Sequence, residues 1–154
     1  MTAEEVLIQK DRPIISIDPN STVADAIAKM LENNIGAILV KDGEKYVGIW
    51  TERDLMNNVV TEGFYSKTSK IKDYMNTNLE LEPHTDTLFQ LMDKCLRKKH
   101  RHLIIQKNGK IIGMLSSGDI GRAQLMEKSK EFDDLNKMVK WDYYEDWKWK
   151  KKNK

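Results

Sequence analysis

Two short turns in the sequence carry the residues best suited to bind a ligand. Each turn follows an apolar strand candidate that ends in a glycine and two apolar residues. A hydroxyl residue comes next, and an aspartate follows it three places later. The first pair is Thr51 with Asp54, and the second pair, Ser116 with Asp119, lies 65 residues further on. A motif that returns in this way indicates an internal repeat of about that length.

A hydroxyl residue followed by an acid at this spacing is first of all a helix N-terminal cap. The side-chain oxygen accepts a free backbone N–H group, and the carboxylate lies near the positive end of the helix dipole. The same place suits a ligand, because exposed N–H groups can donate to phosphate oxygens and a carboxylate can accept hydrogen bonds from both hydroxyls of a ribose diol. Apolar strand residues beside it could enclose a purine ring. The residues therefore predict a cap in each copy and favour a nucleotide site built on it.

The remainder of the sequence offers no catalytic machinery. Cys95 is the single cysteine, which excludes an intramolecular disulfide, and its place on an apolar helical stripe indicates packing rather than nucleophilic chemistry. His100 and His102 have no acid or cysteine at metal-ligand spacing. We therefore expect a protein that is not an enzyme and that holds no metal.

Composition is ordinary for a soluble globular protein. The chain has 154 residues, of which 40% are hydrophobic and 32% are charged, and its net charge is +2. No apolar run approaches the roughly 20 residues that span a bilayer, and the acidic first residues do not resemble a signal peptide. We expect a cytoplasmic protein. A net charge of +2 is too small to indicate nucleic-acid binding by itself.

The elements that must hold the two turns occur in the same order in both halves. In the first half, a short lead-in helix over 3–9 precedes a strand over 14–17. A helix then begins near Thr22, with apolar residues at helical spacing. A hairpin with an Asp-Gly turn follows and leads into Thr51 and a second helix.

The second half repeats this order after a polar segment. Residues 71–75 form the lead-in, 79–81 a strand, and Asn108-Gly109 the hairpin turn before the strand that ends at Leu115. Each half is too small to bury a large core alone, so we expect the two to share one. The predicted boundaries are a first repeat at 5–63, a linker at 64–70, a second repeat at 71–122 and a C-terminal extension at 123–154.

This doubled pattern resembles the cystathionine β-synthase (CBS) domain, and the tandem pair resembles a Bateman module. The resemblance covers about residues 5–122 and rests on the order and spacing of all the motifs together. The matching segments are Ile14–Ser16 with Pro19 and Thr22, 35–40, 48–54, Leu79–Leu81 with Pro83 and Thr87, 101–105 and 113–119. The fold it implies is α+β, with two pseudo-symmetric β-α-β-β-α repeats packed sheet to sheet and a long C-terminal helix.

The resemblance implies a regulatory module that binds an adenosine-type nucleotide in the cleft between the repeats: AMP, ADP, ATP or S-adenosylmethionine. The aspartates of the two turns would bind ribose, and the hydroxyl residues Thr51 and Ser116 would assist them. By the family pattern, each pocket would add residues from the opposite repeat. The Asp119 site would add Ile15, Ser16, Ile35 and Ala37, and the Asp54 site would add Leu79, Glu80, Arg101 and His102.

Phosphate ligands are expected among the basic residues near these turns. Arg53 lies next to Asp54, and the cluster His100-Arg101-His102 precedes a strand. The alternative is a solvated basic helix end that continues Arg97-Lys98-Lys99. The sequence departs from the family in lacking a proline in the strands at 37–40 and 102–105, and Glu80 would place a negative charge near the Asp54 site. We therefore expect two unequal sites, with at least one occupied.

The C-terminal extension lies outside the resemblance. Residues 120–149 contain almost no helix breaker and predict one long amphipathic helix that packs on the module or on a second chain. Residues 140–154 combine three tryptophans with six lysines. They suggest an alternative function as a nucleic-acid or membrane-surface adaptor, against the simpler interpretation of a solvated tail. We expect a homodimer with an unidentified protein partner. A third alternative is a purely structural pair with empty clefts.

Overall fold

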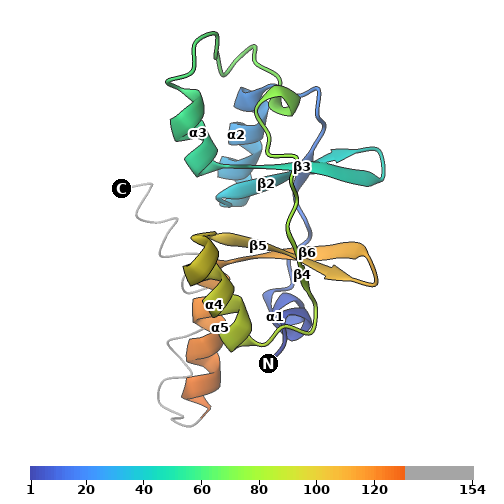
Figure 1. Cartoon of the computed structure of the whole chain (residues 1–154), viewed down its shortest axis with the longest axis vertical. Coiled ribbons are helices and arrows are strands. Elements are labelled where there is room, and N and C mark those ends of the chain that lie inside the picture. The colour runs from blue at the N-terminus through green and yellow to red at the C-terminus, as the bar shows by residue number, and fades with distance from the viewer. Residues whose placement is uncertain (131–154) are drawn as a thin grey trace. The chain divides into compact units, whose positions relative to one another are not determined.

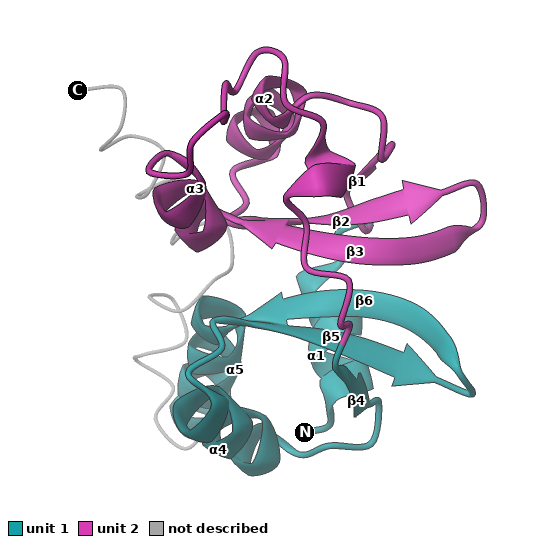
Figure 2. Cartoon of the chain, turned by 45° about the horizontal axis from the view of Figure 1, so that its top comes forward, with its two compact units in different colours: residues 1–13, 80–154 teal, residues 14–79 magenta. Residues whose placement is uncertain are grey.

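The computed structural model describes residues 1–130, which form helices and two small mixed sheets (Figure 1). The α+β class expected from the sequence is confirmed. The chain divides into two compact units, which are described separately. Unit 2 comprises residues 14–79, and the described part of unit 1 comprises residues 1–13 and 80–130 (Figure 2). The predicted helix over 120–149 falls partly outside the described residues.

Unit 2 contains one three-stranded sheet with helices on one face (Figures 1 and 2). Strand β1 pairs in parallel with β2, and β2 pairs antiparallel with β3. The elements are β1 (Ser16–Ile17), α2 (Val23–Asn33), β2 (Ala37–Asp42), β3 (Lys45–Thr51), α3 (Glu52–Asn58) and the short 3₁₀ turn η1 (Ile71–Asp73). The core gathers buried residues from every one of these elements except α3, with Trp50 as its largest fully buried side chain.

Unit 1 repeats this sheet and adds a helix from the start of the chain. Strand β4 pairs in parallel with β5, and β5 pairs antiparallel with β6. The elements are α1 (Ala3–Lys10), β4 (Leu81–Pro83), α4 (Leu88–Lys98), β5 (His102–Lys107), β6 (Lys110–Ser116) and α5 (Ser117–Ser129). Ala3 and Val6 of α1 are fully buried and join the same core as Leu91 and Leu115.

The lead-in segments are exchanged relative to their order in the sequence. Helix α1 precedes the first repeat but packs in unit 1, whereas η1 precedes the second repeat but packs in unit 2 through the fully buried Ile71. Two glycines make room for these segments. A Cβ atom on Gly113 would overlap Leu7, and one on Gly48 would overlap Met75. Each hairpin therefore accepts a lead-in close against its returning strand.

Local sequence signals explain where the helices begin. All five α-helices of residues 1–130 start with a capping box, in which the cap side chain and the side chain three residues later each accept a backbone N–H group. The caps predicted at Thr51 and Ser116 are confirmed. Since Thr2, Thr22 and Thr87 form the same box elsewhere, capping alone does not mark a ligand site.

Candidate functional site

The first turn leaves part of its carboxylate open. The Thr51 backbone N–H donates to Asp54 Oδ2 at 2.9 Å, and the Thr51 hydroxyl oxygen lies 3.1 Å from the same atom. Asp54 N–H donates back to the hydroxyl at 3.2 Å. Within residues 1–130, Oδ1 of Asp54 has no hydrogen-bond partner, and the residue is half-buried. This oxygen therefore keeps its acceptor positions for a further donor.

The second turn has the same backbone geometry. Ser116 N–H donates to Asp119 Oδ2 at 2.8 Å, and Asp119 N–H donates to Ser116 Oγ at 3.0 Å. The first helical N–H group also behaves alike in both copies: Glu52 donates to the Gly36 carbonyl, and Ser117 donates to the Arg101 carbonyl. The repeat is therefore preserved down to single hydrogen bonds.

The two carboxylates differ in their charged partners. Lys10 Nζ lies 2.8 Å from Asp119 Oδ2 and also donates to the Met114 carbonyl at 3.1 Å. Arg122 Nη2 lies 2.6 Å from Oδ1. The Asp119 side chain is only 4% exposed. Burial alone would raise its pKa, but the charge and hydrogen bond of Lys10, the Ser116 N–H group and Arg122 outweigh it and hold the pKa below its ordinary value.

The other residues predicted in the first repeat lie in unit 2 around its sheet. Ala37 is the register partner of Thr51, and it is fully buried. Ser16 lies one strand further across, where its carbonyl accepts Lys29 Nζ at 2.6 Å. Ile15 and Ile35 are half-buried against the unit 2 core, and Arg53 is exposed on α3.

The residues predicted in the second repeat are split by the unit boundary. Leu79 is the last residue of unit 2, whereas Glu80, Arg101 and His102 belong to unit 1. His102 is the register partner of Ser116, as Ala37 is of Thr51. Arg101 is exposed. Each predicted pocket combines residues of both units, so the assignment of opposite-repeat residues to Asp54 and Asp119 stays a prediction.

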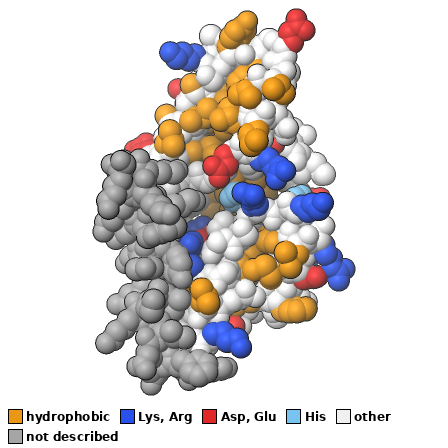
Figure 3. Space-filling model, turned by 90° about the vertical axis from the view of Figure 1, so that its left-hand side faces the viewer, with side chains coloured by type: hydrophobic (Ala, Val, Ile, Leu, Met, Phe, Trp, Pro, Cys, Tyr) orange, Lys and Arg blue, Asp and Glu red, His pale blue; other side chains and the backbone are white. Residues whose placement is uncertain are grey.

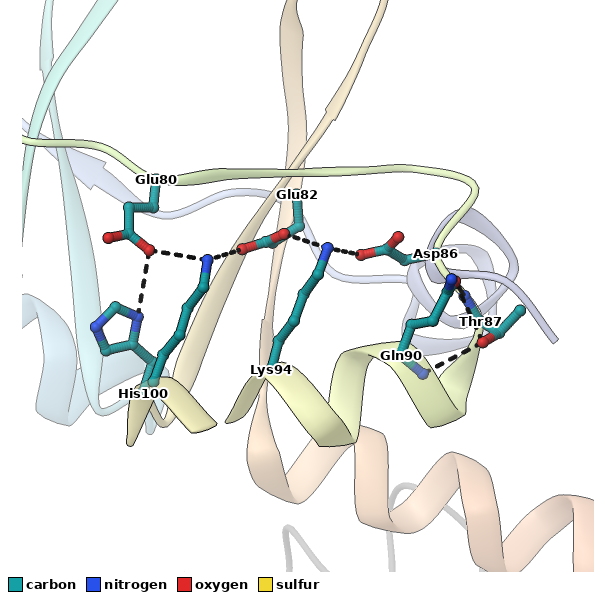
Figure 4. A network of polar contacts seen from close by, with 8 residues as sticks. Glu80, Glu82, Asp86, Thr87, Gln90, Lys94 and His100 are labelled. Atoms are coloured by element: carbon teal, nitrogen blue, oxygen red, sulfur yellow. Dashed lines mark hydrogen bonds and ion pairs between the residues drawn. The ribbon is translucent and has the colours of Figure 1, made fainter. Parts of the chain in front are cut away.

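Glu80 is part of an ion-pair network that sequence reasoning missed (Figure 4). Lys98 lies between Glu80, at 3.1 Å, and Glu82, at 2.9 Å. Lys94 in turn binds Glu82 and Asp86. Both Glu82 and Asp86 are buried. The charge of Glu80 is thus paired within unit 1, with His100 Nδ1 3.9 Å away.

The ion-pair network lowers the pKa of Glu82. Burial would raise the pKa of this carboxyl group, but the hydrogen bonds from Lys94 and Lys98 outweigh burial and lower it. Since the cations satisfy the buried oxygens, the network ties the strand β4 to helix α4. It has the character of a structural clamp.

Metal-ligating groups and the cysteine are further candidates for chemistry within residues 1–130. No group of three or more histidine, cysteine or acidic side chains there could hold a metal ion. Cys95 is buried, and burial raises the pKa of its thiol, which disfavours the reactive thiolate. In the same part of the chain, no helix combines the length and apolar character needed to cross a membrane. The predicted tail contact at 140–154 lies outside the described residues.

Comparison with known proteins assigns the repeats. The CBS domain family model matches residues 3–61 and 71–125. The CBS domain-containing protein CBSX3 of Arabidopsis thaliana is 35% identical over 130 residues, which cover 80% of this chain but only 63% of that protein. This chain therefore spans less than two thirds of that relative's length.

Solved structures share the fold. The CBS-domain containing protein ATU1752 from Agrobacterium tumefaciens superposes with a TM-score of 0.75 at 29% identity, covering 80% of this chain and 99% of that chain. The CBS domain protein PAE2072 from Pyrobaculum aerophilum, solved in complex with AMP, gives a TM-score of 0.69 at 23% identity, covering 84% of this chain and 99% of that chain. Repeats, turn geometry and comparisons agree: the chain belongs to the CBS domain family and carries two tandem copies of its repeat.

Proposed function

We propose that this protein is a non-catalytic regulatory module that binds an adenosine-type nucleotide and transmits its occupancy to a protein partner or a second copy of the chain. AMP, ADP, ATP and S-adenosylmethionine share the adenosine moiety that the site would recognise. Ribose is bound by the aspartate of the repeated turn, and Asp54 is the stronger candidate.

The open Oδ1 atom of Asp54 carries this proposal. A ribose diol presents two neighbouring hydroxyl donors, and an ionised carboxylate has about four acceptor positions, of which Asp54 uses two, both for Thr51. Rotation of the Thr51 hydroxyl would free a third. Charge-assisted hydrogen bonds of this kind are about twice as strong as neutral ones. The family membership of the chain and the AMP complex of the PAE2072 protein support the choice of ligand.

Transmission requires a surface that another protein can contact. Both units expose hydrophobic side chains on their helices, some of which are visible in Figure 3. In unit 1, Phe89 and Leu96 of α4 are 78% and 71% exposed, and Met56 of α3 in unit 2 is 72% exposed. Phe89 and Leu96 are seven residues apart and so lie on the same face of α4. An exposed apolar face favours a protein contact, and we propose a homodimer as the simplest assembly. A ligand that binds one dimer geometry better would shift the population toward it.

A thermal-shift panel tests the nucleotide proposal. AMP, ADP, ATP and S-adenosylmethionine are added to wild type, to Asp54→Asn and to the control Glu52→Gln, which removes an exposed acid from the same helical turn. A ligand at 100 times its dissociation constant should stabilise wild type and the control by about 2.7 kcal/mol. The Asp54→Asn variant should lose most of that shift. If no ligand shifts the wild type, the proposal fails.

The adaptor function of residues 140–154 remains an alternative prediction. Binding to nucleic acid through this lysine-rich segment should weaken steeply as salt rises and disappear on truncation at Lys140. Adenosine binding should survive both changes. Titration of labelled single-stranded DNA at two salt concentrations distinguishes the two functions.

A further inference from the structure

We propose that Lys10 serves as a built-in ligand of Asp119, which closes the second turn, so that each chain takes one nucleotide and takes it through Asp54. This inference rests on the proposed function and specifies its stoichiometry. Lys10 comes from the last turn of α1, a segment that precedes the first repeat in sequence but packs in unit 1.

The acceptor capacity of the two aspartates is the first argument. Asp119 Oδ2 already accepts the Ser116 N–H group and the Lys10 ammonium, and Oδ1 accepts Arg122. About one of four acceptor positions therefore remains for a diol that needs two. Asp54 keeps its whole Oδ1 atom for an incoming ligand. The Asp119 side chain is also 4% exposed, so a sugar would reach it only after a side chain moves.

The second argument comes from matching positions in the two repeats. Arg122 lies three residues after Asp119, and the residue three after Asp54 is the neutral, exposed Asn57. The Met114 carbonyl accepts the Lys10 ammonium, whereas its counterpart in the first repeat, the Ile49 carbonyl, accepts the backbone N–H of Asn76. The two places from which Arg122 and Lys10 approach Asp119 are therefore occupied in the first repeat by neutral groups, the Asn57 side chain and the Asn76 backbone N–H.

The third argument is that Lys10 is held in place. Helix α1 is anchored by the buried Ala3 and Val6, and its Glu4 pairs with Lys107 of β5 at 2.7 Å. The Lys10 side chain is only 20% exposed. An ammonium tethered beside a buried carboxylate competes with ribose hydroxyls as a charged donor against neutral ones, and it loses little entropy on binding.

Isothermal titration with AMP, on proteins whose folding is checked by circular dichroism, tests the stoichiometry. Wild type should bind one AMP per chain, and Asp54→Asn should reduce that affinity at least about tenfold. The double variant Lys10→Met, Arg122→Asn removes both cations and should bind two. Lys10→Arg keeps a cation at the same place and should bind one, as wild type does.

A reciprocal variant tests the same idea on an exposed surface that tolerates substitution. Asn57→Arg places in the first repeat the cation that Arg122 provides in the second, and it should weaken AMP binding about tenfold. Asn57→Gln is the matched neutral control and should bind AMP as wild type does.

The outcomes separate this inference from the proposed function. Two AMP molecules per wild-type chain, or one that is lost in Asp119→Asn and kept in Asp54→Asn, would overturn the role of Lys10 and leave nucleotide binding standing. A double variant that folds and still binds one AMP would also overturn it. AMP binding by none of the proteins would overturn the one-AMP stoichiometry. The proposed function itself fails only if ADP, ATP and S-adenosylmethionine also give no thermal shift with wild type.

Discussion

Asp119 shows how one buried carboxylate can depend on a residue far away in the sequence. Its partner Lys10 is 109 positions distant, and the pair is joined by Arg122 in the same helical turn as the carboxylate. Because these groups lower the pKa of Asp119 in the folded state, the ionised form stabilises the fold. The pair therefore links the charge state of one side chain to the packing of α1.

This linkage predicts a pH dependence. A carboxyl group with a lowered folded pKa contributes stability above its unfolded pKa of about 3.9 and loses it as pH falls through the folded value. At pH 7, Lys10→Met should reduce the free energy of unfolding by about 1–3 kcal/mol, since the buried Asp119 carboxylate loses a charged hydrogen-bond donor and keeps only Ser116 N–H and Arg122. Urea unfolding of both proteins at pH 7, 5 and 3 should show the difference unchanged to pH 5 and smaller at pH 3.

The difference between the two proteins isolates this pair, because Glu82, whose pKa is also lowered, is present in both. A difference that stayed constant down to pH 3 would show that Lys10 stabilises the protein by packing alone. In that case Asp119 would draw its ionised character from Ser116 and Arg122.

At the scale of these residues, the sequence predicts the local contacts and misses the distant ones. Thr51–Asp54 and Ser116–Asp119 are recognisable because a cap depends on residues three apart. Arg122 lies three places after Asp119 and could have been noticed as its neighbour on the helix. Lys10 could not, since nothing in the local pattern of α1 indicates which sheet the helix covers.

Among the secondary-structure elements, β4 departs most from the sequence prediction. The sequence predicted a strand over 79–81, but the strand is Leu81–Pro83. Leu81 is 40% exposed, and Glu82 is 4% exposed. Hydrophobic periodicity fails here because Lys94 and Lys98 make a buried glutamate acceptable at a position that otherwise requires an apolar residue.

The clamp between β4 and α4 should therefore be sensitive to its lysines. Lys94→Met leaves Glu82 facing Asp86 without their shared cation, and removing one partner of a buried ion pair costs about 3–5 kcal/mol. Arg97→Met is the control on the same helix: Arg97 pairs with Asp93 at the surface, is 78% exposed, and should cost less than about 1 kcal/mol. Chemical denaturation at pH 7 measures both.

Equal effects of the two substitutions would contradict the clamp. They would mean that water reaches Glu82 and Asp86 as readily as it reaches Asp93. The strand would then be held to the sheet by its backbone pairing with β5 alone.

For the whole molecule, the repeat predicts the fold class but not the composition of the folding units. Two copies of one pattern indicate two similar sheets, and the structure has them. The sequence boundaries at 5–63 and 71–122 assign each lead-in to the repeat it precedes. Leu7 packs on Gly113 and Met75 on Gly48, and both are apolar residues meeting a glycine. Composition does not distinguish the two pairings, so the exchange was not predictable.

The packing of α1 in unit 1 can be tested with two substitutions in this helix. Val6→Ala removes a fully buried side chain from the unit 1 core and should cost about 1.5–3 kcal/mol, whereas Ile8→Ala, at a position 69% exposed, should cost little. Hydrogen exchange followed by mass spectrometry should show faster exchange in Val6→Ala mainly within residues 80–130. Faster hydrogen exchange mainly within residues 14–79 would instead show that α1 packs in unit 2, which would contradict the structure.

The exchanged lead-ins also set an order for folding during synthesis. Residues 14–79 leave the ribosome as an uninterrupted run and can complete unit 2 at once. The first thirteen residues emerge earlier but must wait for the sheet and helices of 80–130. At about 5–20 residues per second, that delay is roughly 6 to 25 seconds. Residues 1–13 therefore lack their packing partners while unit 2 folds, and Lys10 reaches Asp119 among the last contacts to form.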